Sequence, residues 1–164
     1  MTAPALILTV HGTPAPQGSK TRNRAGAMYE SSAKVKPWRE AVKTAALDAL
    51  SYDICWSPLI EPVRVEVTFT LARPKHHYGT GRNAGVVKAS APQHPTGKPD
   101  VDKTTRATLD ALTDAGVWRD DSFVTSLTAT KAYPFSGPDA LPHPGAVIRV
   151  WRLNTPKEEP SCPS

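Results

Sequence analysis

The sequence predicts a single α/β domain of the α+β kind, in which a small mixed β-sheet packs against two main helices. Segments with strand and helix patterns follow one another in the order β-α-β-loop-α-β-β, which indicates this class. The chain has 164 residues and 39% apolar residues, which suits one domain with a real core. We therefore expect a domain over residues 1–154 and a disordered polar tail over 155–164.

The first half of the chain carries two strand patterns and one helix pattern. Leu6–Val10 is a short apolar run that ends near Gly12, which predicts a strand. Residues 17–36 form a polar, basic stretch that we expect to be a loop. Pro37–Leu50 predicts a helix, because proline suits the first turn and apolar residues follow at helical spacing. Val63–Leu71 alternates apolar and polar residues, which predicts a strand with one buried face.

The second half opens with a long segment that lacks any periodicity. Arg73–Pro99 contains no acidic residue, and a loop of this length inside a domain is usually functional or disordered. Val101–Ala115 then predicts a helix that stops at Gly116. Ser122–Lys131 and Ala146–Leu153 read as the last two strands, joined by a proline-rich loop.

Charge and composition narrow the classes of partner. The formal net charge of +5 favours a polyanion such as nucleic acid or an anionic membrane surface. No apolar run approaches the ~20 residues that span a bilayer, so no membrane insertion is expected. Cys55 and Cys162 have no metal-site spacing and make no disulfide framework, which favours a reducing cytoplasm.

Four aspartates bracket the predicted second helix. Asp100 and Asp102 lie where the loop becomes the helix, and the adjacent pair Asp120 and Asp121 follows its end. A helix N-terminus favours carboxylates, and Asp102 suits the N-cap position. That structural explanation accounts for one aspartate well, but not for the other three.

A metal site is the functional explanation for these acids. A helix of about four turns, followed by a turn at Gly116, could bring the later pair back towards the earlier one. Converging carboxylates repel one another unless a cation lies between them, and hard ions such as Mg²⁺ prefer oxygen ligands. Such ions activate water and stabilise charge in phosphoryl transfer. The alternative is that these acids form an ordinary solvated surface.

Arg106 lies on the same helix face as Asp102, four residues earlier. Its guanidinium could reach the same pocket and bind a scissile phosphate. It could equally form an ion pair with Asp102 or with Asp110. Asp110 and Asp114 are interpreted as surface or helix-pairing acids outside the site.

The acidic segment resembles the signature of the RusA family of Holliday junction resolvases. The residues that carry the likeness are Lys98-Pro99-Asp100-Val101-Asp102, Leu109-Asp110-Ala111-Leu112, Gly116-Val117-Trp118 and Asp120-Asp121-Ser122-Phe123-Val124. The segment Ser31–Arg39 is also similar to phage members of the family. The likeness extends over Leu6–Leu153 and is specific around the aspartates.

The resemblance implies a RusA-like fold, a homodimer, dependence on Mg²⁺ or Mn²⁺, and paired symmetric nicks across a four-way DNA junction. It places the catalytic residues at Asp100, Asp102, Asp121 and Arg106, and the metal ligands at Asp100, Asp102, Asp120 and Asp121. Two positions depart from the family pattern. Arg106 stands where the family has lysine, and arginine cannot give up a proton as a general acid. Lys103 stands where the family usually has asparagine.

Basic residues in the two long loops are the candidates for DNA contact. They are Lys20, Arg22, Arg24, Lys75, Arg82, Lys88, Lys98 and Lys103. For the first three, contact with the DNA backbone and simple solvation are about equally supported. The histidines have no zinc-site spacing, and we expect His76 and His77 to be solvated or to face phosphate.

The function predicted from these features is metal-dependent resolution of Holliday junctions in DNA recombination and repair. The resemblance implies a phage- or prophage-encoded enzyme that acts in the bacterial cytoplasm. Two alternatives stay open: a less selective nuclease for branched DNA in phage replication, and a non-catalytic basic DNA-binding protein. Trp151 and Val147 of the last strand are the candidates for a dimer interface, and Trp151 is also a candidate core residue.

Overall fold

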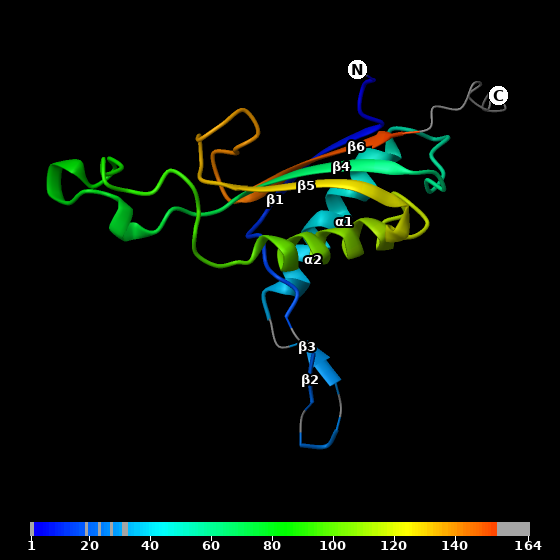
Figure 1. Ribbon diagram of the computed structural model, residues 1–164, viewed down its shortest axis with the longest axis horizontal. Coiled ribbons are helices and arrows are strands. Elements are labelled where there is room, and N and C mark those ends of the chain that lie inside the picture. Colours follow the sequence, from blue (N-terminus) through cyan, green and yellow to red (C-terminus); the bar gives the residue numbers. More distant parts are fainter. Residues whose placement is uncertain (1, 19, 23, 27, 31–32, 154–164) are drawn as a thin grey trace.

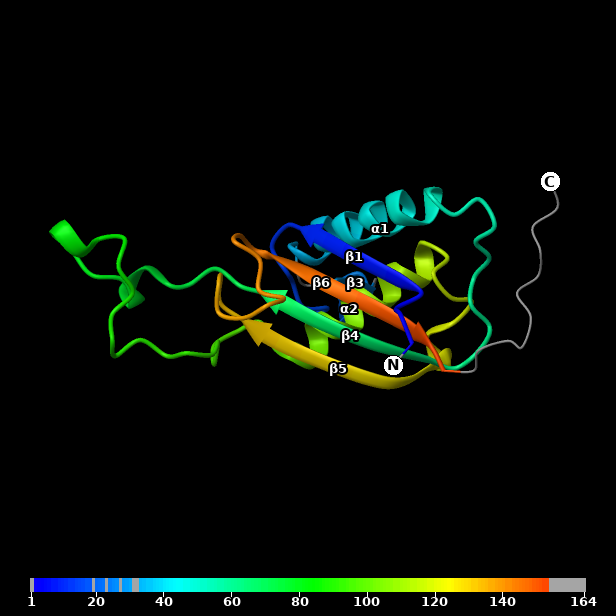
Figure 2. The ribbon, with the colours of Figure 1, turned by 90° about the horizontal axis from the view of Figure 1, so that it is seen from above.

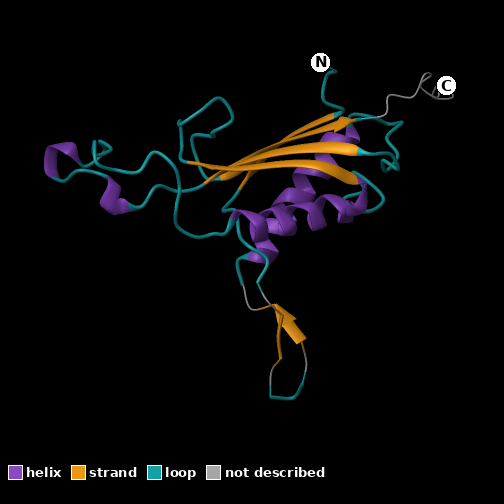
Figure 3. Cartoon of the chain, in the orientation of Figure 1, coloured by secondary structure: helices purple, strands orange, loops and turns teal. Residues whose placement is uncertain are grey.

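A four-stranded sheet carries both long helices on one face, so the body has two layers (Figures 1 and 3). The computed structural model describes residues 2–18, 20–22, 24–26, 28–30 and 33–153. The predicted α+β class, with a mixed sheet and two main helices, is confirmed. The predicted tail lies outside the described residues, and the proposed domain boundary stays a prediction.

The order of the strands across the sheet is β1-β6-β4-β5. Their bounds are Leu6–His11 for β1, Gly145–Arg152 for β6, Val63–Thr70 for β4 and Val124–Ala132 for β5. Only β4 and β5 run parallel, while the other neighbours are antiparallel. A parallel pair needs a crossover connection, and here it contains a long arm followed by α2, Val101–Asp114.

The core lies between the sheet and the helices. Alternate residues of β1 and β4 are buried on the helix side, and for β4 the alternation of apolar and polar residues predicts this. The first helix, α1, spans Val35–Ser51 and buries Trp38, whose indole N–H donates to the hydroxyl of Thr108 on α2 (3.1 Å). This buried bond ties the two helices together beneath the sheet.

The helix boundaries differ slightly from the predicted ones. α1 begins at Val35, and Pro37 lies in its first turn, where a backbone N–H is not required. α2 begins at Val101, so its N-cap is Asp100, and the suggested capping by Asp102 is wrong. Gly116, with φ +80, turns the chain beyond the helix as predicted.

Two segments project from the body. Residues 73–99, here called the arm, extend beyond the end of the sheet (Figures 1 and 2). The arm contains short 3₁₀ turns at Lys75–His77 and Gly81–Asn83, so it is not featureless loop. The stretch predicted as a plain loop before α1 instead contains a hairpin of β2, Lys20–Arg22, and β3, Met28–Glu30.

Three further findings concern membrane-spanning helices, a cysteine and two residues of the last strand. No helix in the described part of the chain is long and apolar enough to cross a membrane. Cys55 is disulfide-bonded, so the expectation of reduced thiols is wrong for this residue. Trp151 and Val147 are 9% and 8% exposed, so both are buried within the protomer and are unsuited to a dimer interface. Trp151 packs under the guanidinium of Arg64, 4.1 Å from the ring centroid.

Candidate active site

A pocket of about 350 Å³ lies between α2 and β5. Three polar side chains from the predicted site line it: Asp102 and Arg106 from α2, and Asp121 from the turn before β5. Leu109 and Leu127 add apolar wall. The pocket therefore brings two carboxylates and one guanidinium to a common surface.

The start of α2 determines where Asp102 lies. Asp102 is in the first turn of the helix, where the partial positive charge of the backbone N–H groups favours a carboxylate. The hydroxyl of Thr105 donates to the Val101 carbonyl (2.7 Å), so this buried side chain is satisfied within the helix. Asp102 and Arg106 are one turn apart, and both side chains therefore project from the same face.

Asp100 is not among the residues that line this pocket. Its carboxylate lies 3.1 Å from the ammonium of Lys103, and the carboxylate side chain is 46% exposed. Its backbone carbonyl accepts hydrogen bonds from the N–H and the hydroxyl of Thr104, at 3.0 and 2.9 Å. Lys103, where the family usually has asparagine, therefore holds the Asp100 carboxylate in an ion pair.

Asp120 has a local structural partner. Its carboxylate accepts the backbone N–H of Ser122 at 2.8 Å and so caps the short turn Asp121–Phe123. Hydrogen bonds from the side chain and the backbone of Ser122 lower the pKa of Asp120 below its usual value. Asp121, the next residue, is the member of the pair that lines the pocket.

The four carboxylates do not meet at one point. Within the ranges that the structure describes, no group of three or more acidic, histidine or cysteine side chains is placed to hold a metal ion. Two local contacts set the other two apart: Asp100 is paired with Lys103, and Asp120 accepts the backbone N–H of Ser122. Asp102 and Asp121 share the pocket, whereas Asp100 and Asp120 do not line it, and the ligand assignment stays a prediction.

Arg106 is exposed and has no carboxylate within 4 Å in the part of the chain that is described. The ion pairs considered for it with Asp102 and Asp110 are not formed. Asp114 instead pairs with Arg39 of α1 (2.8 Å), as expected of a helix-pairing acid. The guanidinium of Arg106 is therefore available to an anion in the pocket.

Lys131, near the end of β5, is a residue that the sequence analysis missed. Its ammonium donates to the carbonyls of Gly97 and Pro99, at 2.7 and 3.1 Å. These two carbonyls belong to the last residues before Asp100. Lys131 therefore clamps the end of the arm, and with it the start of α2, to the sheet. No sequence signal marks this role, because the partners are backbone atoms more than thirty residues away.

The arm presents half of the predicted DNA-contacting residues. Lys75, Arg82, Lys88 and Lys98 are all exposed. The ammonium of Lys88 donates to the His76 carbonyl (3.0 Å), which braces the arm internally. Arg24 is exposed in the hairpin, and the side chains of Lys20 and Arg22 lie outside the described residues.

His77 is buried at the root of the arm, so the expectation that it is solvated or faces phosphate is wrong. It is 7% exposed and packs edge-on against Tyr133, with ring centroids 5.7 Å apart. Burial lowers the pKa of His77, and the charges of His76, Arg73 and Lys88 lower it further. A neutral His77 therefore acts as a packing residue between the arm and the body.

The donor set of the pocket fits a hard divalent cation. Mg²⁺ is usually held by one or two carboxylates together with water and substrate phosphate, not by a cage made only of protein. Asp102 and Asp121 supply two carboxylates to one pocket, and the guanidinium of Arg106 can bind a phosphate group beside them. Soft or imidazole-preferring metals have no matching ligands among the residues that line it.

Comparison with known proteins identifies the family of the chain. No curated protein is a significant match to the sequence. A family model described as endodeoxyribonuclease RusA matches residues 11–139, which include the arm, α2 and the acidic turn. Because the match covers most of the chain, the protein belongs to the RusA family of endodeoxyribonucleases.

Proposed function

We propose that this RusA-family endodeoxyribonuclease resolves Holliday junctions by Mg²⁺- or Mn²⁺-dependent hydrolysis of paired, symmetric phosphodiester bonds. The observation that carries the proposal is the pocket lined together by Asp102, Arg106 and Asp121. Hard oxygen ligands and a phosphate-binding guanidinium are what phosphodiester hydrolysis needs at one place. In the cell, the activity serves DNA recombination and repair in the cytoplasm of a bacterium that carries the phage or prophage.

Each residue of the pocket has a distinct task. Asp102 and Asp121 would hold the divalent ion, which would supply an activated water and charge stabilisation at the scissile phosphate. Arg106 orients that phosphate through its planar N–H donors. Because arginine stays protonated, Arg106 acts by positioning and charge, and the leaving oxygen takes its proton from solvent.

Asp100 joins the ligand set only if its carboxylate leaves Lys103. The ion pair is exposed on both sides, with 51% and 46% of the two side chains accessible, so separating the partners costs little. A DNA phosphate beside Lys103 offers the ammonium a replacement partner and frees Asp100 for the metal. Substrate binding thereby completes the site.

A homodimer matches the symmetry of the substrate. The two strands cut in a four-way junction are related by a two-fold axis, and each chain supplies one site. A C2 dimer presents two equivalent sites to those strands, and two-fold dimers are the commonest oligomers. Sedimentation as a monomer both alone and on a junction would favour a less selective nuclease of branched DNA.

The test compares carboxylates inside and outside the pocket. Asp102→Asn and Asp121→Asn should each reduce cleavage of a synthetic four-way junction in Mg²⁺ by about 10³-fold or more, while binding without metal is kept. Asp110→Asn is the matched control on the same helix and should cleave normally. Wild-type rates in either pocket variant would refute the assignment, and binding without cleavage by the wild type would favour a non-catalytic DNA-binding protein. Three-way and linear duplexes measured beside the junction report its selectivity.

A further inference from the structure

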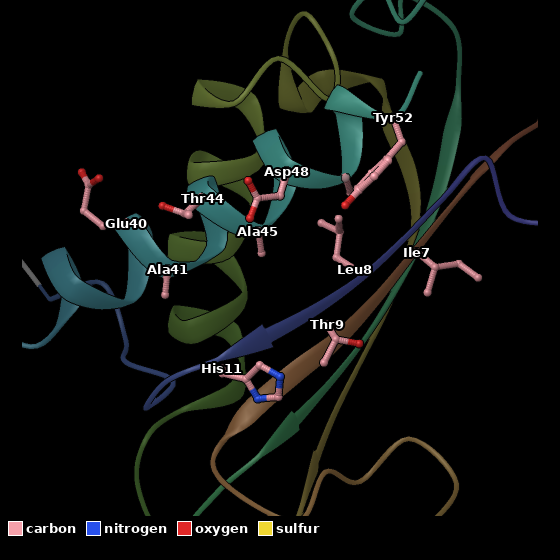
Figure 4. Close-up of a pocket in the computed structure, with 11 residues that line it drawn as sticks. Ile7, Leu8, Thr9, His11, Glu40, Ala41, Thr44, Ala45, Asp48 and Tyr52 are labelled. Carbon is pink, nitrogen blue, oxygen red and sulfur yellow. The ribbon is translucent and has the colours of Figure 1, made fainter. Parts of the chain in front are cut away.

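A second groove, of about 590 Å³, runs between α1 and the outer edge of β1 (Figure 4). Ile7, Leu8 and Thr9 of β1 line one side, and residues from Glu40 to Tyr52 of α1 line the other. None of the residues that line the 350 Å³ pocket lies in it. The proposed nuclease chemistry leaves this groove without a role.

The edge of β1 that faces the groove is free to pair. Among the described strands only β6 lies beside β1, and the register between them is continuous. The N–H of Gly12, just after β1, donates to the Pro144 carbonyl (3.2 Å). The backbone groups of every second residue before Gly12 therefore also point towards β6. The backbone N–H and C=O groups of Ile7, Thr9 and His11 therefore point to the open edge.

This edge lacks the devices that usually prevent pairing. Exposed edge strands are normally protected by a charged side chain, a proline, a bulge or a covering loop. β1 reads Leu-Ile-Leu-Thr-Val-His, without a lysine, an acid or a proline, and it has no register shift. Ile7 is 55% exposed, and Tyr52 at the same end of the groove is 91% exposed. A strand added here would cover both apolar side chains.

The charge of the groove selects the chemistry of its occupant. Glu40 and Asp48 line it, and no lysine or arginine does, although the chain as a whole carries a net charge of +5. Neither carboxylate forms an ion pair within the part of the chain that the structure describes. DNA phosphates would be repelled, whereas lysine or arginine side chains would be attracted.

Two other occupants fit this charge less well. A symmetric second copy would pair β1 with its own mate and bring the same carboxylates of both copies to one interface. The chain's C-terminal segment, residues 154–164, carries two glutamates and one lysine, so it also meets like charge. A separate basic segment meets neither objection.

We propose that the β1–α1 groove binds an extended, lysine- or arginine-bearing segment of another protein, which adds to the sheet as a fifth strand beside β1. Main-chain hydrogen bonds to Ile7, Thr9 and His11 supply the pairing, and Glu40 and Asp48 select basic side chains. The surface is separate from the arm and the pocket, so a bound partner leaves both accessible to DNA.

The test uses a blocked hexapeptide of alternating lysine and valine, with the full-length protein. Amide hydrogen exchange should slow by at least tenfold at Ile7, Thr9 and His11, and stay unchanged at Leu8 and Val10, which already pair with β6. The double change Glu40→Gln with Asp48→Asn should weaken binding by about two- to thirtyfold, the range for two exposed ion pairs. Asp110→Asn is the charge-matched control and should not change the affinity.

Two peptide controls keep the proposal falsifiable even if a protein variant is unstable. A hexapeptide with an N-methyl group on every residue loses the backbone donors of both edges, and a glutamate–valine hexapeptide reverses the charge. Neither should bind. Equal binding of either control, or no slowing of exchange at millimolar lysine–valine peptide, would overturn the proposal. Protection of the same amides without peptide, rising with protein concentration, would assign the groove to a second copy instead.

Discussion

Replacing Lys131 by methionine tests whether the clamp on the end of the arm positions the active site. Methionine keeps an unbranched apolar stem but removes the ammonium that donates to the carbonyls of Gly97 and Pro99. The residue after Pro99 is Asp100, and α2 with Asp102 follows at once. The substitution should therefore loosen the start of α2 relative to β5 without touching the pocket itself.

The size of the effect follows from the two bonds. A hydrogen bond with a charged partner contributes about 1.5–3 kcal/mol when it is well shielded. Here the bond to Gly97 is exposed and the bond to Pro99 is only partly buried, so solvent screens both. We expect the free energy of unfolding to fall by about 1–2 kcal/mol in total. Because a displacement of about 1 Å in a catalytic group can cost about 10²-fold, kcat should fall by about 10- to 100-fold.

The assay separates positioning from DNA contact. Single-turnover cleavage of a four-way junction gives the rate of the bound complex, and titration without metal gives Kd and its salt dependence. Lys131→Arg, which keeps the charge and donors, should recover part of the rate. Lys43→Met on α1 is a control that removes a lysine with no such clamp. A different result would show that Lys131 contacts phosphate instead: the single-turnover rate stays unchanged, Kd rises, and the slope of log Kd against log salt concentration becomes smaller by about one.

Two further predictions concern the loop over the sheet and the arm. Asp139 accepts two hydrogen bonds from Arg149, at 2.6 and 2.7 Å, and these bonds lower the pKa of Asp139. The pair should contribute about 1 kcal/mol to the free energy of unfolding at neutral pH, a value reduced because both side chains are partly exposed to solvent. This contribution is lost as the pH falls through the lowered pKa of Asp139. Urea denaturation of Asp139→Asn should therefore differ from wild type at pH 7 and converge with it at acidic pH, whereas a constant difference would contradict the linkage. The second change neutralises three basic residues of the arm together, Lys75, Arg82 and Lys88. It should weaken binding to junction and to duplex alike and reduce the salt dependence of Kd, because contacts to phosphate do not depend on DNA sequence. Unchanged binding titrations would show that the arm does not contact DNA.

Most of the fold was predictable because its elements carry strong local patterns. The strict alternation of β4 and the helical spacing in α1 and α2 each place one apolar face towards the core. The β2–β3 hairpin was missed because its strands have only three residues each, too few for a period-two pattern to stand out. Where β6 lies, between β1 and β4, is set by long-range pairing that no local pattern encodes.

The candidate site was predictable in its residues and less so in its geometry. Motif spacing led to Asp102, Arg106 and Asp121, and these three do line one pocket. The expectation that four carboxylates converge is wrong for the described residues, among which no group of three or more such ligands could hold a metal ion. The ion pair of Asp100 with Lys103 and the capping by Asp120 depend on side-chain choices among nearby partners, which spacing alone does not determine.

The parallel pairing of β4 and β5 accounts for the layout of the site. A chain that leaves β4 must return along the whole sheet before β5 can begin, and here the return path contains both the arm and α2. The basic arm therefore ends at the residue before Asp100, and Lys131 bonds that end back to β5. Because these parts share one crossover, DNA bound to the arm, as we propose, would act directly on the segment that carries Asp100 and Asp102. Lys103, which pairs with Asp100 in this structure, lies at the same point of the chain, and in our proposal a phosphate bound by Lys103 would free that carboxylate.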